Sequence, residues 1–121
     1  MLFFSCSKKD NNIQDNSKAN ISNNNAKSWK LTKIFINGSL QNLTGAQLLF
    51  TKTYKSDDTW QDSDGYSGTY SIVSPQLCKE ITINSSGGNT TIDYKINSLN
   101  QFTLDMEYTF NQQTYRFVYG Q

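Results

Sequence analysis

The residues of this chain that could bind a metal ion or act in catalysis are those with carboxylate side chains. Four of them lie within eight positions: Asp57, Asp58, Asp62 and Asp64. The stretch Asp62-Ser63-Asp64-Gly65 is similar to the start of a calcium-binding loop. Such a loop needs glycine at its sixth position and a closing glutamate, whereas Gly65 comes two positions early and no glutamate closes the stretch. These residue types also favour tight turns. We therefore predict a turn here and no metal site.

A second carboxylate pair, Asp105 and Glu107, could act as a general acid and base. The two residues are two positions apart, so in a strand they share one face. No nucleophile accompanies them, and the chain has no histidine, the commonest general base. A solvated strand face is the simpler interpretation. We expect no catalytic residues, no enzymatic activity and no cofactor.

Composition and charge favour a small β-protein. The chain has 121 residues, of which 36% are hydrophobic and 13% aromatic, with a single proline. Seven tyrosines and seven phenylalanines can bury a large area from few positions, and both types favour strands. The net charge is +1 without a clustered basic stretch, so we expect no nucleic-acid partner.

The first six residues, Met1-Leu2-Phe3-Phe4-Ser5-Cys6, form an apolar run that ends in a small residue and a cysteine. This pattern resembles the end of a bacterial lipoprotein signal peptide, which implies that Cys6 carries the lipid. It implies an outer-membrane lipoprotein on the periplasmic or surface side. The run is shorter than the apolar core of a complete signal peptide, and far shorter than the roughly 20 residues of a membrane-spanning helix. An ordinary N-terminus with a chance cysteine is the alternative.

Residues 7–27 are rich in asparagine, serine and lysine, with few apolar side chains. Such a segment buries too little surface to offset its ordering entropy. We predict that residues 1–27 are a signal remnant and a disordered tether, and that residues 28–121 form one domain. Cys78 is the other cysteine, and we expect no disulfide between it and Cys6.

Residues 102–110 alternate apolar and polar side chains without a break, which predicts a strand with one dry face and one wet face. Seven further segments have strand-like patterns separated by turn residues: 28–37, 46–54, 59–61, 66–73, 77–84, 90–97 and 114–119. In 46–54, Lys52 interrupts the apolar phase of Phe50 and Tyr54, and in 77–84 Ile81 and Ile83 are expected to point inward. We predict an all-β, eight-stranded antiparallel up-and-down barrel. A Greek-key sandwich is the alternative.

Two motifs, Ser28-Trp29-Lys30-Leu31 and Tyr115-Arg116-Phe117-Val118, resemble the first and last strands of lipocalin-like (calycin-type) proteins. Between them, Asp58-Thr59-Trp60 and Ser67-Gly68-Thr69-Tyr70-Ser71 resemble small lipocalin-like lipoproteins of the Bacteroidota. The resemblance implies that Trp29 plugs one end of the barrel and that Arg116 lies over it. The alternative is that Trp29 is one more core aromatic and Arg116 an exposed charge.

An eight-stranded barrel can either fill with side chains or hold one small ligand. The dry-face tyrosines Tyr54, Tyr70, Tyr94 and Tyr108 would form an apolar wall with hydroxyl groups, suited to a small hydrophobic or amphipathic ligand. We expect such a site at the end away from Trp29, under the loop of residues 38–45. The alternative is a non-enzymatic interaction module that docks on a cell-envelope protein, or an inhibitor or immunity protein.

Overall fold

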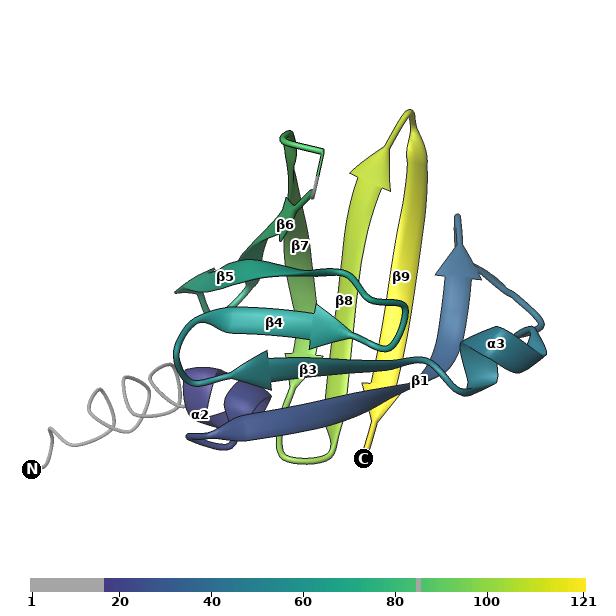
Figure 1. Cartoon of the computed structure of the whole chain (residues 1–121). Coiled ribbons are helices and arrows are strands. Elements are labelled where there is room, and N and C mark those ends of the chain that lie inside the picture. The colour runs from purple at the N-terminus through teal and green to yellow at the C-terminus, as the bar shows by residue number, and fades with distance from the viewer. Residues whose placement is uncertain (1–16, 85) are drawn as a thin grey trace, which may run out of the picture.

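The computed structural model describes residues 17–84 and 86–121 (Figure 1). Within these residues no helix is long and apolar enough to cross a membrane. The elements follow in chain order: α2 (Ser17–Ser22), β1 (Ala26–Ile36), β2 (Ser39–Leu40), α3 (Gly45–Leu48), β3 (Thr51–Lys55), β4 (Thr59–Asp62), β5 (Ser67–Ser74), β6 (Leu77–Ile83), β7 (Asn89–Leu99), β8 (Thr103–Phe110) and β9 (Gln113–Gly120).

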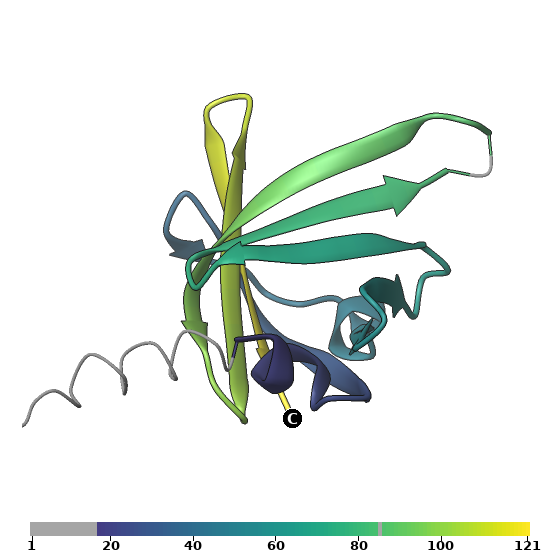
Figure 2. The same ribbon diagram turned by 90° about the vertical axis from the view of Figure 1, so that its left-hand side faces the viewer.

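One antiparallel sheet holds all the strands, in the order β2-β1-β3-β4-β5-β6-β7-β8-β9, and it closes because β1 also pairs with β9. Residues 26–30 of β1 pair with β3, and residues 30–36 pair with β9, with an irregularity between Leu31 and Lys33. This bend in β1 completes the closed wall (Figures 1 and 2). The predicted eight-stranded up-and-down barrel is confirmed, with the two-residue β2 as an extra strand beside β1.

Two tight hairpins use residues with positive φ, as the right-handed twist of paired strands requires. Asn37 and Gly38 (φ 50° and 83°) connect β1 with β2, and Asn111 and Gln112 (φ 51° and 65°) connect β8 with β9. The Asn37 side chain also accepts a hydrogen bond from the Thr114 amide, 2.9 Å away, so the two hairpins are joined.

The strand predicted over residues 46–54 is wrong in its first half. Thr44 caps a short helix, α3, by accepting from the Gln47 amide, while the Gln47 side chain accepts from the Thr44 amide. This reciprocal capping box satisfies amides that would otherwise lack partners at a helix start. The strand β3 therefore begins only at Thr51.

The tether prediction is also wrong for its described part, residues 17–27. Residues Ser17–Ser22 form α2, and β1 already begins at Ala26. Asn23 and Asn24 adopt positive φ and end the helix, a conformation that asparagine tolerates. A single apolar residue, Ile21, is fully buried and ties the polar segment to the barrel. Cys6 and the rest of the predicted tether lie outside the described residues.

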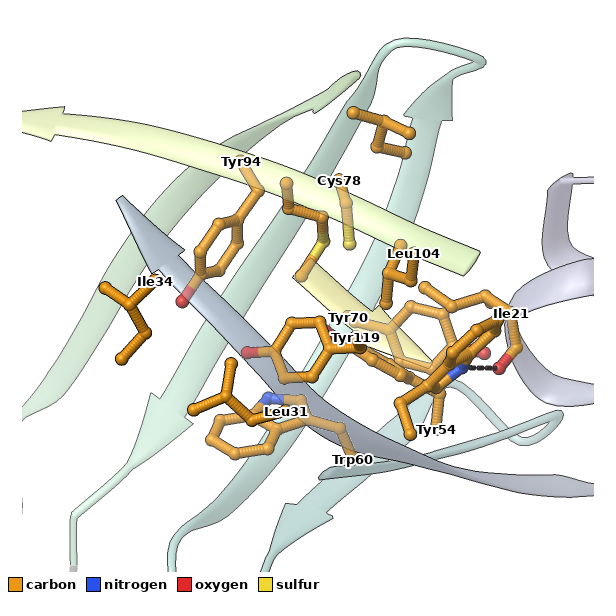
Figure 3. Packing of buried hydrophobic residues seen from close by; sticks show 13 residues of the cluster. Ile21, Leu31, Ile34, Tyr54, Trp60, Tyr70, Cys78, Tyr94, Leu104 and Tyr119 are labelled. Atoms are coloured by element: carbon orange, nitrogen blue, oxygen red, sulfur yellow. Dashed lines mark hydrogen bonds between the residues drawn. The ribbon is translucent and has the colours of Figure 1, made fainter. Parts of the chain in front are cut away.

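The core is a continuous cluster inside the barrel (Figure 3). It begins at Ile21 of α2 and continues past Tyr119 toward Ile34 and Tyr94. Gly68 on β5 makes room for part of it, because a Cβ there would lie 1.7 Å from the Ile81 carbonyl oxygen and 3.0 Å from the Trp60 indole nitrogen. This close approach explains a glycine in the middle of a strand.

Candidate functional site

Trp29 lies at the end of the barrel beside α2, which we call the closed end. Its side chain is fully buried, and its indole nitrogen donates a hydrogen bond to the Ile21 carbonyl, 2.9 Å away (Figure 3). The ammonium of Lys27 lies 4.4 Å from the centre of the Trp29 ring and donates to the carbonyls of Asn20 and Gln101. Lys27 thus links α2 and the β7–β8 turn across the indole.

The prediction that Arg116 covers Trp29 is wrong, because Arg116 has other partners. Its guanidinium donates two hydrogen bonds to Asp105, at 2.9 and 2.7 Å, and lies 4.7 Å from the centre of the Phe35 ring. Strand register places Phe35 opposite Arg116, near the middle of β9 rather than at the closed end. Asn97 donates to both Asp105 and Glu107, at 3.2 and 2.8 Å, so the carboxylate pair belongs to a hydrogen-bonded network that contains the Arg116–Asp105 ion pair.

The Arg116–Asp105 pair shifts both pKa values in the direction that stabilises the charges. Burial alone raises the pKa of Asp105, but hydrogen bonds from Arg116 and Asn97 and the charge of Arg116 outweigh it, so that this pKa lies below its usual value. The hydrogen bond to Asp105 raises the pKa of Arg116. Because the folded-state pKa of Asp105 is depressed, its stabilising contribution is present at neutral pH and is lost as the pH falls through that pKa.

Only one of the four predicted tyrosines lines the opening into the barrel that lies opposite α2. Tyr54 and Tyr70 are buried and pack edge to face, with their ring centres 5.0 Å apart. The Tyr70 hydroxyl donates a hydrogen bond to the Lys55 carbonyl near α2. Burial raises the pKa of Tyr70 to about 12. Tyr108 stacks on Tyr115 between β8 and β9. Tyr94 alone faces the opening.

The opening lies at the opposite end from α2, and we call this end the mouth. It is bordered by α3, by the β4–β5 turn and by the β6–β7 hairpin, which gather on the right-hand side of Figure 2. A cavity of about 440 Å³, the mouth cavity, opens there. Its lining combines apolar and aromatic residues with polar and charged ones: Leu31, Ile34, Phe50, Trp60, Tyr66, Ile92, Tyr94, Phe117 and Tyr119, with Gln47, Lys52, Asp62, Asp64, Glu80, Thr82, Asn84 and Thr90.

The predicted cover for the site, the loop of residues 38–45, does not line this cavity. Leu40 is 62% exposed, and Leu43 packs against the core instead. The chain next to that loop supplies the border, through Gln47 of α3 and Phe50 just after it. The predicted end of the barrel is thus where the cavity lies, but the predicted loop is not its lid.

The inner end of the mouth cavity holds a buried ion pair. The Lys52 ammonium lies 2.6 Å from Glu80 Oε1, and the Tyr54 hydroxyl donates to Glu80 Oε2. Only 5% of Lys52 and 1% of Glu80 is exposed. The same ammonium lies 4.5, 5.1 and 5.5 Å from the ring centres of Trp60, Tyr94 and Tyr54. A cation with a carboxylate partner and aromatic faces around it is compensated for its lost hydration.

The sequence interpretation missed Lys52 and Glu80. Lys52 has the same phase as Tyr54 along β3, so it does not interrupt the inward face but belongs to it. On β6 the predicted inward residues Ile81 and Ile83 are wrong: Cys78 and Glu80 are buried, and Ile83 is 55% exposed. Lys52 and Glu80 have opposite charges and occupy inward-facing positions of two different strands. That combination was the signal that could have revealed the pair.

The aspartates at the rim form a turn, as predicted. Asp62 Oδ1 accepts hydrogen bonds from the amides of Asp64 and Tyr66, at 2.9 and 3.0 Å. Within residues 17–84 and 86–121, no group of three or more cysteine, aspartate or glutamate side chains is placed to hold a metal ion. Cys78 is a free thiol in the core, where burial raises its pKa and keeps it protonated.

No model of a known protein family, no curated protein and no solved structure matches this chain. Fold and cavity alone therefore define its class: a closed, eight-stranded, antiparallel barrel with a short helix at one end and a cavity at the other.

Proposed function

We propose that this lipocalin-like barrel binds a small amphipathic molecule in the mouth cavity. The observation that carries the proposal is a cavity of about 440 Å³ with apolar walls and a buried Lys52–Glu80 pair at its inner end. Small-molecule sites typically have volumes of about 300–1,000 Å³ and combine apolar walls with a few polar groups. The mouth cavity has both properties.

The buried pair favours a polar but uncharged group at the inner end of the ligand. Lys52 and Glu80 neutralise one another, so an added carboxylate would leave an uncompensated buried charge. The lysine ammonium has three N–H donors, of which one is directed to Glu80 Oε1. A hydroxyl or carbonyl oxygen of the ligand can accept another, while Leu31, Ile92 and Phe117 contact its apolar part.

Filling the cavity with a larger side chain should weaken ligand binding. Thr82 lines the mouth cavity, whereas its neighbour Ile83 on β6 is exposed and is not part of the lining, so Thr82→Trp and Ile83→Trp form a matched pair. We expect Thr82→Trp to weaken binding of Nile red by at least about tenfold, or 1.4 kcal/mol, and Ile83→Trp to leave it unchanged. Fluorescence titration measures both.

Competition with the same dye tests the ligand class. Dodecanol should displace Nile red more effectively than dodecanoate, because only the acid adds a charge beside the Lys52–Glu80 pair. Equal dye binding by wild type, Thr82→Trp and Ile83→Trp would contradict a site in the mouth cavity.

We further propose that Cys6 carries a lipid and anchors the barrel to the outer membrane. The support is the motif Phe4-Ser5-Cys6 followed by residues 7–16, which are polar except for Ile13. We expect the wild-type protein in the membrane fraction of the native cell and a Cys6→Ser variant in the soluble fraction. A Cys6→Ser variant that stays with the membranes would exclude this anchor.

A further inference from the structure

The barrel wall has a cleft between β7 and β8. The two strands pair only where Lys95–Leu99 of β7 faces Leu104–Glu107 of β8. Residues 89–94 of β7 pair with β6, and residues 108–110 of β8 pair with β9, so the two hairpins diverge (Figures 1 and 2). A cavity of about 420 Å³ lies between them, lined by residues 90–93 and 108–110.

Main-chain groups of β7 point into this cleft. The Ile96 amide donates to the Gln76 carbonyl, on the β6 side of the strand, at 2.8 Å. Hydrogen-bonding direction alternates along a strand, so Thr90, Ile92 and Tyr94 also face β6. The amides and carbonyls of Thr91 and Asp93 therefore face the opposite way, toward β8.

The facing edge of β8 is equally unpaired. Lys95 has the same direction as Asp93 and pairs with Glu107, so the main chain of Glu107 faces β7. Thr109, two residues further, shares this direction but has no partner on β7 in the ladder between these two described strands. The cleft thus presents unpaired donors and acceptors on both sides, spaced as they are along an extended chain.

We propose that the cleft binds an extended peptide segment of another protein as an added strand along β7. Main-chain hydrogen bonds to Thr91 and Asp93 supply the affinity, as in other cases of strand addition. Ile92, Tyr108 and Phe110 line the cleft, so they can contact apolar side chains of the peptide, and Phe110 is 62% exposed. The segment has β-branched or aromatic residues at alternate positions and lacks proline.

The shape of the cleft selects a single chain rather than a second barrel. Both sides are walled, by the β6–β7 hairpin and by the β8–β9 hairpin (Figure 2). One strand fits between two such walls, whereas the edge of another folded sheet would collide with one of them. The cleft shares Thr90 and Ile92 with the lining of the mouth cavity, but the proposal rests on the unpaired main chain of β7 and β8 and not on ligand binding.

Hydrogen exchange of the full chain tests the unpaired edges directly. The amides of Thr91, Asp93 and Thr109 should exchange at least about tenfold faster than those of Thr90 and Ile92, because exchange is slow only for hydrogen-bonded amides. Equal protection of these amides would show that the cleft is closed and would overturn the proposal.

A peptide titration followed by NMR tests the occupant. The probe is the capped peptide Thr-Ile-Thr-Val-Thr-Tyr-Thr, and the control is the same peptide with alternate amides N-methylated. We expect the unmodified peptide to shift and protect the Thr91, Asp93 and Thr109 amides, and the methylated one to bind at least about tenfold more weakly. No response to the unmodified peptide, equal binding of both, or protection that follows protein concentration without peptide would each overturn the proposal.

Two exposed phenylalanines at opposite ends of β8 give matched variants. Phe110 lines the cleft, whereas Phe102, 69% exposed, lies at the other end beside the β7–β8 turn. Both substitutions leave the core intact because both side chains are exposed. Phe110→Ala should weaken binding of the unmodified peptide by about fivefold or more, and Phe102→Ala should leave it unchanged. Equal effects of the two variants would place the peptide elsewhere.

Discussion

Replacing Glu80 with alanine is expected to lower the free energy of unfolding by about 3–5 kcal/mol, because removing one partner of a buried ion pair leaves an uncompensated charge. Glu80 is 1% exposed and accepts from both Lys52 and Tyr54. The variant would leave the Lys52 ammonium among aromatic rings and the Tyr54 hydroxyl without its acceptor. Chemical denaturation monitored by circular dichroism measures the loss.

The double variant Lys52→Met/Glu80→Leu is the control for this result. Buried ion pairs can often be replaced by apolar residues of similar volume at little cost. We expect the double variant to unfold within about 1–2 kcal/mol of the wild type, and so to be more stable than Glu80→Ala. A Glu80→Ala variant as stable as the wild type would show that the pair is not buried as described.

This comparison also separates stability from function. If apolar residues can replace Lys52 and Glu80 without loss of stability, folding alone does not account for the pair. The ligand-binding proposal does account for it, since the pair offers a hydrogen-bond donor at the inner end of an apolar cavity. The double variant should therefore fold but bind dodecanol more weakly, because it lacks the lysine N–H donor at the inner end of the cavity.

Replacing Trp29 with alanine is expected to cost about 3–5 kcal/mol, the usual range for a large aromatic side chain removed from a core. The indole is fully buried and donates to the Ile21 carbonyl, so its loss leaves both a cavity and an unsatisfied acceptor. Trp29→Phe fills most of the space but lacks the donor, and should cost less. Thermal and chemical denaturation of both variants measure the difference.

Double-mutant cycles separate the true partners of Trp29 from the predicted one. Ile21 contacts Trp29 at the closed end of the barrel. The effects of Ile21→Ala and Trp29→Ala on the free energy of unfolding should therefore differ from additivity by about 0.5–3 kcal/mol. Arg116→Ala should add to Trp29→Ala within about 0.5 kcal/mol, because Arg116 contacts Asp105 and Phe35 instead. Strong coupling between Trp29 and Arg116 would contradict the structure.

The sequence alone determined the barrel. Side-chain direction alternates along every strand, so the sequence pattern indicated the inward positions of Leu104, Met106, Tyr94 and Ile96 without knowledge of any partner. The same pattern was wrong at Phe102 and Phe110, which are exposed, and at Asp105, which is buried. Turn residues such as Asn37-Gly38 marked where strands end, because few residue types tolerate positive φ. These signals are local: each depends on residues that are neighbours in the chain. The burial of Trp29 was expected from the resemblance of residues 28–31 to the first strand of lipocalin-like proteins and not from such a local signal.

Only the tertiary structure decided which side chains meet. Lys52 and Glu80 are 28 residues apart, and each alone looks like a solvated charge; inside the barrel, each makes the burial of the other possible. Arg116 forms its ion pair with Asp105, eleven residues away across the β8–β9 hairpin, and does not contact Trp29. The reason is that strand register sets the height of each residue in the barrel. Ile21 explains why part of the polar segment forms the helix α2. Its buried side chain stabilises a short helix whose sequence alone would not be helical. Register and closure are properties of strands far apart in the chain, so no local pattern specifies them.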